Sequence, residues 1–270
     1  MEMLVLGCPF GGAIPSEAGH TIIFPHPMAD SFKARLRHAA NRLLHPLGLH
    51  LSRADRAFEM DGLLARAAAR GVKVGTWIDV GASDGSWSLR ARRHFPQSRY
   101  LLFEPLRERQ RELAALREQH GFEHIAAVAG ARAGTVEFAV DPLLDGSGVA
   151  APGTAGTRSM SVESIDDVLA TRGLPAPYGI KLDTHGYELP VLEGAAHTLP
   201  QASLVVIEAY NFTLTPGSLR FHELCAWLEA RNFRCIDLAD PMRRPRDAAL
   251  WQMDLAFVPS DSPLFDSNEY

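Results

Sequence analysis

The sequence predicts an α/β fold built on a mostly parallel β-sheet, and three observations support this prediction. From residue 76 onward, short β-branched or apolar runs are separated by segments with helical patterning, which is typical of parallel strands joined by crossover helices. A glycine-containing turn directly follows the first of these runs and leads into a helix. Acidic residues stand at the ends of several runs, at the sheet edge where such folds bind ligands.

The first 73 residues do not share this pattern. Residues 1–30 are rich in Gly and Pro without a clear period, which predicts a flexible tail; translation from Met28 is an alternative. Helical periodicity at residues 31–45 and 54–70 predicts an N-terminal helical cap over residues 31–73. This part carries a net charge of +3 against −8 for the remainder. The cap therefore either presents a charged face to a membrane surface or partner, or is simply solvated.

Eight segments after the cap are predicted as strands. Seven of them form the main sheet: residues 76–80, 99–104, 123–128, 178–183, 204–209, 234–239 and 252–258. The eighth, Gly134–Val140, precedes a loop of residues 141–157 that contains four glycines and two prolines. A loop of this length inside a compact domain is usually functional or disordered, and we expect it to border the substrate entrance.

Local signals place the helices between these strands. Pro105 is expected to open one helix and Gly121 to end it. Ser164 and Asp167 form a predicted capping box for the next helix, and Pro190 is predicted in the first turn of another. The connections therefore agree with the predicted strands.

The composition is that of a globular protein and excludes several functional classes. The chain has 270 residues, of which 46% are hydrophobic, and its formal net charge of −5 does not favour nucleic-acid binding. Its three cysteines are too few for a disulfide framework or a paired zinc site. A secretory signal is not expected, and no run reaches the roughly 18 apolar residues that a membrane span needs. These features predict a cytoplasmic protein with reduced thiols.

The turn after the first strand, Asp79–Gly85 (DVGASDG), has the features of a nucleotide-binding turn. Its glycines let the backbone approach a ligand closely, and the helix that begins near Ser86 offers free N–H groups at the same edge. The turn is not the dinucleotide motif, because a third glycine is missing at residues 86–88 and no phosphate-binding lysine follows.

An acidic residue at the end of the second strand strengthens this interpretation. Glu104 lies 23 residues beyond Gly81, where a carboxylate accepts both hydroxyls of a ribose. A glycine turn and a ribose carboxylate without pyrophosphate-binding groups suit a single nucleoside, such as the adenosine of S-adenosylmethionine. The alternative is that Asp79 and Glu104 only cap neighbouring helices.

Several motifs in order resemble the FkbM family of S-adenosylmethionine-dependent methyltransferases over residues 75–258. The motifs are Asp79-x-Gly81-x-x-x-Gly85, Phe103-Glu104-Pro105, Ser164-Ile165-Asp166-Asp167, Lys181-Leu182-Asp183-x-x-Gly186-x-Glu188 and Leu192-x-Gly194-Ala195. The resemblance implies a Rossmann-like class I methyltransferase with a seven-stranded, mostly parallel sheet and helices on both faces. The predicted domain covers residues 74–260, and a short tail of residues 261–270 follows.

The resemblance also implies a reaction and a set of binding residues. The reaction is methylation, usually of a hydroxyl oxygen of a sugar or glycan, a polyketide or another small metabolite. The residues predicted to bind S-adenosyl-L-methionine are Asp79, Gly81, Ala82, Ser83, Gly85, Glu104, Pro105, Ala127 and Asp183. His185 departs from the Gln or other polar residue expected at its position, so the family pattern leaves its role open.

The chemistry of methyl transfer makes His185, Asp183 and Glu208 the candidate catalytic residues. A hydroxyl acceptor must lose its proton, and a histidine titrates in the useful range, so His185 is a candidate general base. Asp183 would orient it or bind the amino group of the cofactor. His185 as a polar residue of the pocket wall, without proton transfer, is the alternative. Lys181 is expected to pair with a carboxylate.

Other readings of the same residues remain open. Asp183, Glu208 and Asn211 could bring three oxygen ligands to one Mg²⁺ ion, although we assign no metal. A nucleotide-dependent oxidoreductase or a non-catalytic binding module are the alternative functions. The expected partner is a small-molecule or glycan hydroxyl acceptor, with Tyr187, Tyr210 and Phe212 as a candidate acceptor wall. The cap is expected to close over the cofactor or to mediate dimerisation.

Overall fold

The computed structural model describes residues 5–6, 49–50, 58–151 and 153–269, and the chain divides into two compact units, residues 1–56 and 57–270. In the first unit, β1 (Val5–Leu6) pairs antiparallel with β2 (Leu49–His50). The predicted helix at residues 31–45 lies outside the described residues, as does most of the predicted tail. All further elements belong to the second unit.

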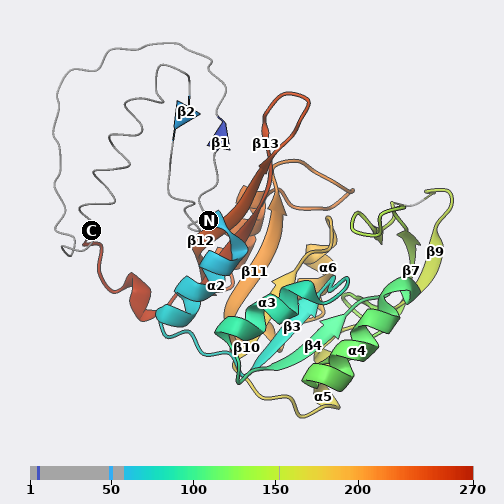
Figure 1. The fold of residues 1–270 in the computed structure, drawn as a ribbon, viewed down its shortest axis with the longest axis horizontal. Coiled ribbons are helices and arrows are strands. Elements are labelled where there is room, and N and C mark those ends of the chain that lie inside the picture. The colour runs from blue at the N-terminus through green and yellow to red at the C-terminus, as the bar shows by residue number, and fades with distance from the viewer. Residues whose placement is uncertain (1–4, 7–48, 51–57, 152, 270) are drawn as a thin grey trace. The chain divides into compact units, whose positions relative to one another are not determined.

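A seven-stranded sheet forms the centre of the second unit (Figure 1). Its order is β12-β13-β11-β10-β3-β4-β5, and its strands are β3 (Thr76–Val80), β4 (Arg99–Phe103), β5 (Glu123–Ile125), β10 (Tyr178–Leu182), β11 (Ala202–Tyr210), β12 (Phe233–Arg243) and β13 (Leu250–Pro259). The strands from β11 to β5 run parallel, whereas β13 is antiparallel to both of its neighbours. This arrangement confirms the predicted seven-stranded, mostly parallel sheet.

Helices cover both faces of this sheet, as predicted. One face packs against α2 (Met60–Ala69), α3 (Ser86–His94) and α4 (Gln110–His120), and the other against α5 (Ile165–Ala170), α6 (Glu188–Glu193) and α7 (Phe221–Glu229). Alternation along β3 places Trp77 in the core under α2, α3 and α4, and Ile78 in the core under α5, α6 and α7. Neither side chain is exposed. Because both faces are covered, the central strands β3 and β10 are buried at every position rather than at alternate ones.

The local signals place the helix ends well, with one correction. Gly121 ends α4 with a left-handed φ of 70°, and the Ser164 hydroxyl accepts the Asp167 N–H at the start of α5. Pro105, however, does not open a helix: α4 begins at Gln110 after a short 3₁₀ turn, η4 (Arg107–Arg109). The Glu104 carboxylate accepts the N–H of residue 106, which holds this segment as a turn instead of a first helical turn.

The predicted strand at residues 123–128 is wrong as a single element. It divides into β5 and β6 (Val128–Ala129), and β6 belongs to a second sheet of order β6-β9-β7-β8. The other strands of this sheet are β7 (Gly134–Ala139), β8 (Gly148–Val149) and β9 (Arg158–Glu163). The strand predicted at 134–140 is confirmed as β7, but the sequence missed β8 and β9, whose side chains are mostly half-buried or exposed. The second sheet has a small core of its own with Leu106, Val128, Phe138 and Val162.

The helix predicted at residues 54–70 is present as α2, from Met60. It packs against the main sheet with Leu63 and Leu64 fully buried, and the Arg66 guanidinium donates two hydrogen bonds, of 2.7 and 2.9 Å, to Asp237 on β12. This helix thus packs within the unit that contains the sheet. Among the described residues, no helix has the length and apolar character to span a membrane.

Candidate active site

A cavity of about 460 Å³ opens at the carboxyl ends of β3, β4 and β10. This volume is within the range of small-molecule pockets, about 300–1,000 Å³. Of the predicted site residues, those that line the cavity are Gly81, Ser83, Glu104, Pro105, Ala127, Asp183 and His185. Asp79, Ala82, Gly85 and Glu208 do not line it. The segment after β7 contributes Leu144, Asp145, Ser147, Gly148 and Val149, so the predicted loop does border the cavity.

Glu104, directly after β4, is held in place by backbone groups. Its side chain is buried, one carboxylate oxygen accepts the Ser83 N–H at 2.8 Å, and the other accepts the Leu106 N–H at 2.9 Å. Burial raises the pKa of Glu104 despite these two hydrogen bonds, which lower it. A carboxylate fixed in this way, with lone pairs left on both oxygens, suits a pair of vicinal hydroxyls.

The glycine turn is joined tightly to β10. Gly81 has φ +72°, and a Cβ added there would lie 2.0 Å from the Asp183 carbonyl oxygen, so no other residue fits. The Lys181 ammonium donates to the Gly81 carbonyl at 2.9 Å, and the Asp183 N–H donates to Val80 at 3.1 Å. The turn after β3 and the end of β10 therefore form one rigid edge of the cavity.

Asp79 and Gly85 support this edge from inside the fold. Asp79 is fully buried, accepts the Ser88 hydroxyl at 2.7 Å and lies 3.1 Å from the Lys181 ammonium. Lys181 therefore pairs with a carboxylate, as predicted. At Gly85, with φ +79°, an added Cβ would lie 2.2 Å from Leu116 of α4, so this glycine allows close helix packing.

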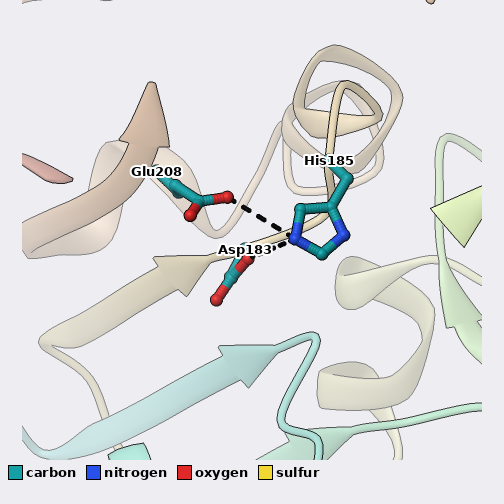
Figure 2. Close-up of side chains that lie close together, drawn as sticks. All are labelled: Asp183, His185 and Glu208. Atoms are coloured by element: carbon teal, nitrogen blue, oxygen red, sulfur yellow. Dashed lines mark ion pairs between the residues drawn. The ribbon is translucent and has the colours of Figure 1, made fainter. Parts of the chain in front are cut away.

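On the other side of the cavity, three titratable side chains meet (Figure 2): Asp183 and His185 follow β10, and Glu208 is on β11. The His185 Nε2 lies 3.3 Å from Asp183 Oδ1 and 3.7 Å from Glu208 Oε2. The His185 Nδ1 lies 3.1 Å from the Ser147 carbonyl oxygen. A carbonyl only accepts, so Nδ1 carries a proton in this arrangement, and Nε2 is the ring nitrogen that faces the two carboxyl groups.

The two carboxyl groups beside Nε2 have different protonation. Burial, and then the nearby Asp183 carboxylate, raise the pKa of Glu208 to about 9, so Glu208 is neutral near pH 7. Glu208 also accepts hydrogen bonds from the Tyr210 hydroxyl and the Gln252 amide. Burial alone would raise the pKa of Asp183, but Lys181 and then His185 outweigh it and lower that pKa. Nε2 therefore faces one carboxylate and one carboxylic acid.

These three side chains are also a candidate ligand set for a metal. One donor atom from each lies within 4.8 Å of the others. Asn211, the third ligand considered from the sequence, points elsewhere: its amide donates to the Leu250 carbonyl at 3.2 Å. The set in the structure thus has one nitrogen and two carboxyl donors instead of three oxygens.

The sequence reading missed three groups at the cavity. Arg109, Asp145 and the Ser147 carbonyl all line it or contact its residues, and the Asp145 carboxylate accepts from Arg109 at 2.8 Å. The only sequence signal was the length of the 141–157 loop, because neither an arginine in a charged helix nor a backbone carbonyl forms a motif.

The strand order and the ligand edge define the class of this protein. A central parallel sheet, extended beyond β11 by the antiparallel β13 and edged by β12, with a glycine turn after β3 and an acidic residue after β4, is the architecture of a Rossmann-like class I methyltransferase. The chain belongs to the FkbM family of methyltransferases: the model of the methyltransferase FkbM domain matches residues 79–235. This membership confirms the predicted family and S-adenosylmethionine as its cofactor, and it disfavours the oxidoreductase alternative.

Solved structures include similar chains of low sequence identity. The FkbM methyltransferase of Methylobacillus flagellatus KT is 18% identical, with a TM-score of 0.47, 67% of this chain covered and 43% of that one. This chain thus spans less than half the length of that protein. The magnesium protoporphyrin IX methyltransferase of Synechocystis, with bound cofactor, is 10% identical, with a TM-score of 0.44 and 87% of each chain covered. The precorrin-6y C5,15-methyltransferase of Geobacter metallireducens is 12% identical, with a TM-score of 0.42, 77% of this chain covered and 94% of that one. A comparison with curated proteins gives no match.

Proposed function

We propose that this protein transfers the methyl group of S-adenosylmethionine to a hydroxyl oxygen, with His185 as the general base. The observation that carries this proposal is the fixed ring of His185. Its Nδ1 is occupied by the Ser147 carbonyl, and its Nε2 is beside a cavity that also contains the backbone-held carboxylate of Glu104. A proton acceptor and a nucleoside-binding group thus border one cavity.

The cavity residues divide the work of binding the cofactor. In this proposal, Glu104 accepts the ribose hydroxyls, and the backbone at Gly81 and Ser83 borders the amino-acid part. Pro105 and Ala127 flank the adenine. Bound there, the cofactor supplies an electrophilic methyl group on a sulfonium. Asp79, Ala82 and Gly85 are proposed to act through the shape of the turn, because their side chains or positions face the protein interior.

In this proposal, the cluster of Asp183, His185 and Glu208 removes the proton of the acceptor hydroxyl. As the new C–O bond forms and the S–C bond breaks, His185 Nε2 takes the hydroxyl proton. Asp183, ionised and 3.3 Å away, stabilises the positive charge that the ring acquires. Glu208 is neutral because burial raises its pKa, so Asp183 is the one negative charge among these three side chains.

The cavity lining and the net charge support a small-molecule acceptor over a nucleic acid. Among the cavity-lining residues, Arg109 is the one Lys or Arg, and the net charge of the chain is −5, which disfavours a nucleic acid. We propose a sugar or glycan, polyketide or other small hydroxyl compound. The dimer, the cytoplasmic location and the acceptor wall of Tyr187, Tyr210 and Phe212 stay predictions.

Titration calorimetry tests the binding half of this proposal. We expect S-adenosylmethionine and S-adenosylhomocysteine to bind at micromolar levels, and NAD not to bind. Screening hydroxyl compounds with methyl-labelled cofactor then tests the reaction, with a methyl ether as the expected product. Binding of NAD alone would favour the oxidoreductase, and cofactor binding with no product from any acceptor class would favour a non-catalytic module.

A further inference from the structure

One short segment connects the two sides of the cavity. We call residues 141–149 the bridging segment; it begins after β7 and ends with β8. In the middle of the segment, a single oxygen of Asp145 accepts from the Arg109 guanidinium at 2.8 Å and from the Ser83 hydroxyl at 3.3 Å. Ser83 is the residue whose N–H holds Glu104. The middle of the segment is thus tied to the groups that we assign to the cofactor.

The C-terminal end of the bridging segment contacts His185. The Ser147 carbonyl accepts from Nδ1 at 3.1 Å, and a Cβ added at Gly148 would lie 3.6 Å from the His185 Cβ. The backbone at Gly148 therefore lies beside the histidine, with room for about one methyl group between them. The tautomer of the His185 ring depends on the Ser147 carbonyl, because a hydrogen bond to this carbonyl favours the proton on Nδ1.

The segment is stiff enough to couple its ends. The Asp141 N–H donates to the Ser147 hydroxyl at 3.0 Å, and the Ser147 N–H donates to the Leu144 carbonyl at 3.1 Å. Leu144 and Val149 pack against the core of the second sheet. Since only one residue separates Asp145 from Ser147 along a turn closed by these bonds, we expect displacement at Asp145 to shift the carbonyl at Ser147.

We propose that Asp145 is a positioning residue for methyl transfer: it ties the bridging segment to Ser83 and Arg109 so that the Ser147 carbonyl keeps Nδ1 of His185 protonated and the ring oriented with Nε2 toward Asp183. This inference rests on the proposed role of His185 as the general base. The Asp145 side chain is 76% exposed, and ion pairs of such exposure contribute little to stability. Its position at the cavity, between two lining residues, therefore points to alignment rather than to folding.

The test compares Asp145→Ala and Asp145→Asn with a matched control. Glu123→Ala removes another exposed carboxylate–arginine pair, of 2.8 Å with Arg172, at the start of β5 and so at the opposite edge of the sheet. The readout is ¹⁵N NMR of the His185 imidazole, assigned by its absence in His185→Asn. It reports the tautomer without any acceptor or cofactor.

We expect the wild type and Glu123→Ala to show Nδ1–H, and Asp145→Ala to show a mixture with Nε2–H. With an acceptor, kcat of Asp145→Ala should fall about tenfold, below the full contribution of a general base, while KM for the acceptor changes little. Asp145→Asn keeps an oxygen for Arg109 and should recover most of both properties.

A wild-type tautomer in both Asp145 variants overturns the inference. Should Asp145→Ala not fold, the thermal melt shows it, and Arg109→Ala, which removes the 2.8 Å partner of Asp145, decides by the same readout: a mixture of tautomers supports the inference and a wild-type tautomer overturns it. The proposed function fails differently, through unchanged turnover in His185→Asn, and the tautomer result remains interpretable in that case.

Discussion

The two sides of the cavity are built in different ways. On the side of β4, a carboxylate is held by two backbone N–H groups, so Glu104 has one position and one set of partners. On the side of β10 and β11, Asp183, His185 and Glu208 hold one another, and the charge on each depends on the other two. The first side is fixed by the backbone, and the second is adjustable by proton movement.

This difference matches what each side is proposed to do. A cofactor-binding group should not change between one turnover and the next, and backbone donors do not titrate. A proton-accepting group must change its charge in every turnover, which needs neighbours that tolerate both states. The contrast predicts that substitutions on the side of β4 lower cofactor affinity, whereas substitutions on the side of β10 and β11 lower kcat.

The largest effect is expected for His185→Asn. The amide cannot take a proton, so kcat should fall by about 10²–10⁴-fold, the usual contribution of a general base. The dissociation constant of S-adenosylmethionine should stay within about twofold by calorimetry, because general-base loss does not remove a binding group. Turnover equal to that of the wild type across pH 6–9 would remove His185 from the mechanism.

Glu104→Gln should have the opposite signature. It keeps one acceptor oxygen for the backbone but loses the charge, and hydrogen bonds to charged groups contribute about 1.5–3 kcal/mol each, so cofactor affinity should fall about 10–100-fold. At saturating cofactor, kcat should stay near that of the wild type. Unchanged affinity would contradict the ribose assignment, and a thermal melt controls for misfolding around Ser83 and Leu106.

The side fixed by the backbone was the more predictable from sequence. Gly81 and Glu104 were found from their spacing, because a close backbone approach and a strand-end carboxylate leave a residue-type signal. The main sheet was predicted for the same reason, since buried parallel strands are continuous apolar runs. Asp79 was found by the same motif, yet it lies in the interior beside Ser88 and Lys181, because motif position does not say which face a side chain takes.

The adjustable side could be predicted only in part. His185, Asp183 and Glu208 were identified as candidates, but their distances depend on β10 and β11 being neighbours. The Ser147 carbonyl that sets the tautomer belongs to no motif, because every residue has a carbonyl. The strand predicted at 123–128 failed for a related reason: β6 pairs with β9, and pairing between distant segments leaves no local pattern.

Glu208→Gln tests the charge pattern through stability. With a folded pKa of about 9, the folded state keeps a proton that the unfolded state releases above its ordinary value, so stability is lost as pH rises toward 9. Asp254, with a pKa of about 7, contributes in the same direction but only below that pH. The Tm of the wild type should therefore fall by a few degrees between pH 7.5 and 9, and that of Glu208→Gln should fall less. Parallel curves would show that Glu208 is ionised in the folded protein.

The smallest effect is expected from removing metal ions, and it decides what holds the adjustable side together. A divalent cation among the three donor atoms, which lie within 4.8 Å of one another, would occupy Nε2 and leave no base. In the proposed mechanism Glu208 carries a proton and no metal ion lies among the three side chains. Exhaustive EDTA treatment should therefore leave turnover and Tm unchanged. Loss of activity that Mg²⁺, Mn²⁺ or Zn²⁺ restores would instead make the three side chains ligands. The acceptor proton would then be lost to solvent from a metal-bound hydroxyl, and the two sides of the cavity would both be fixed.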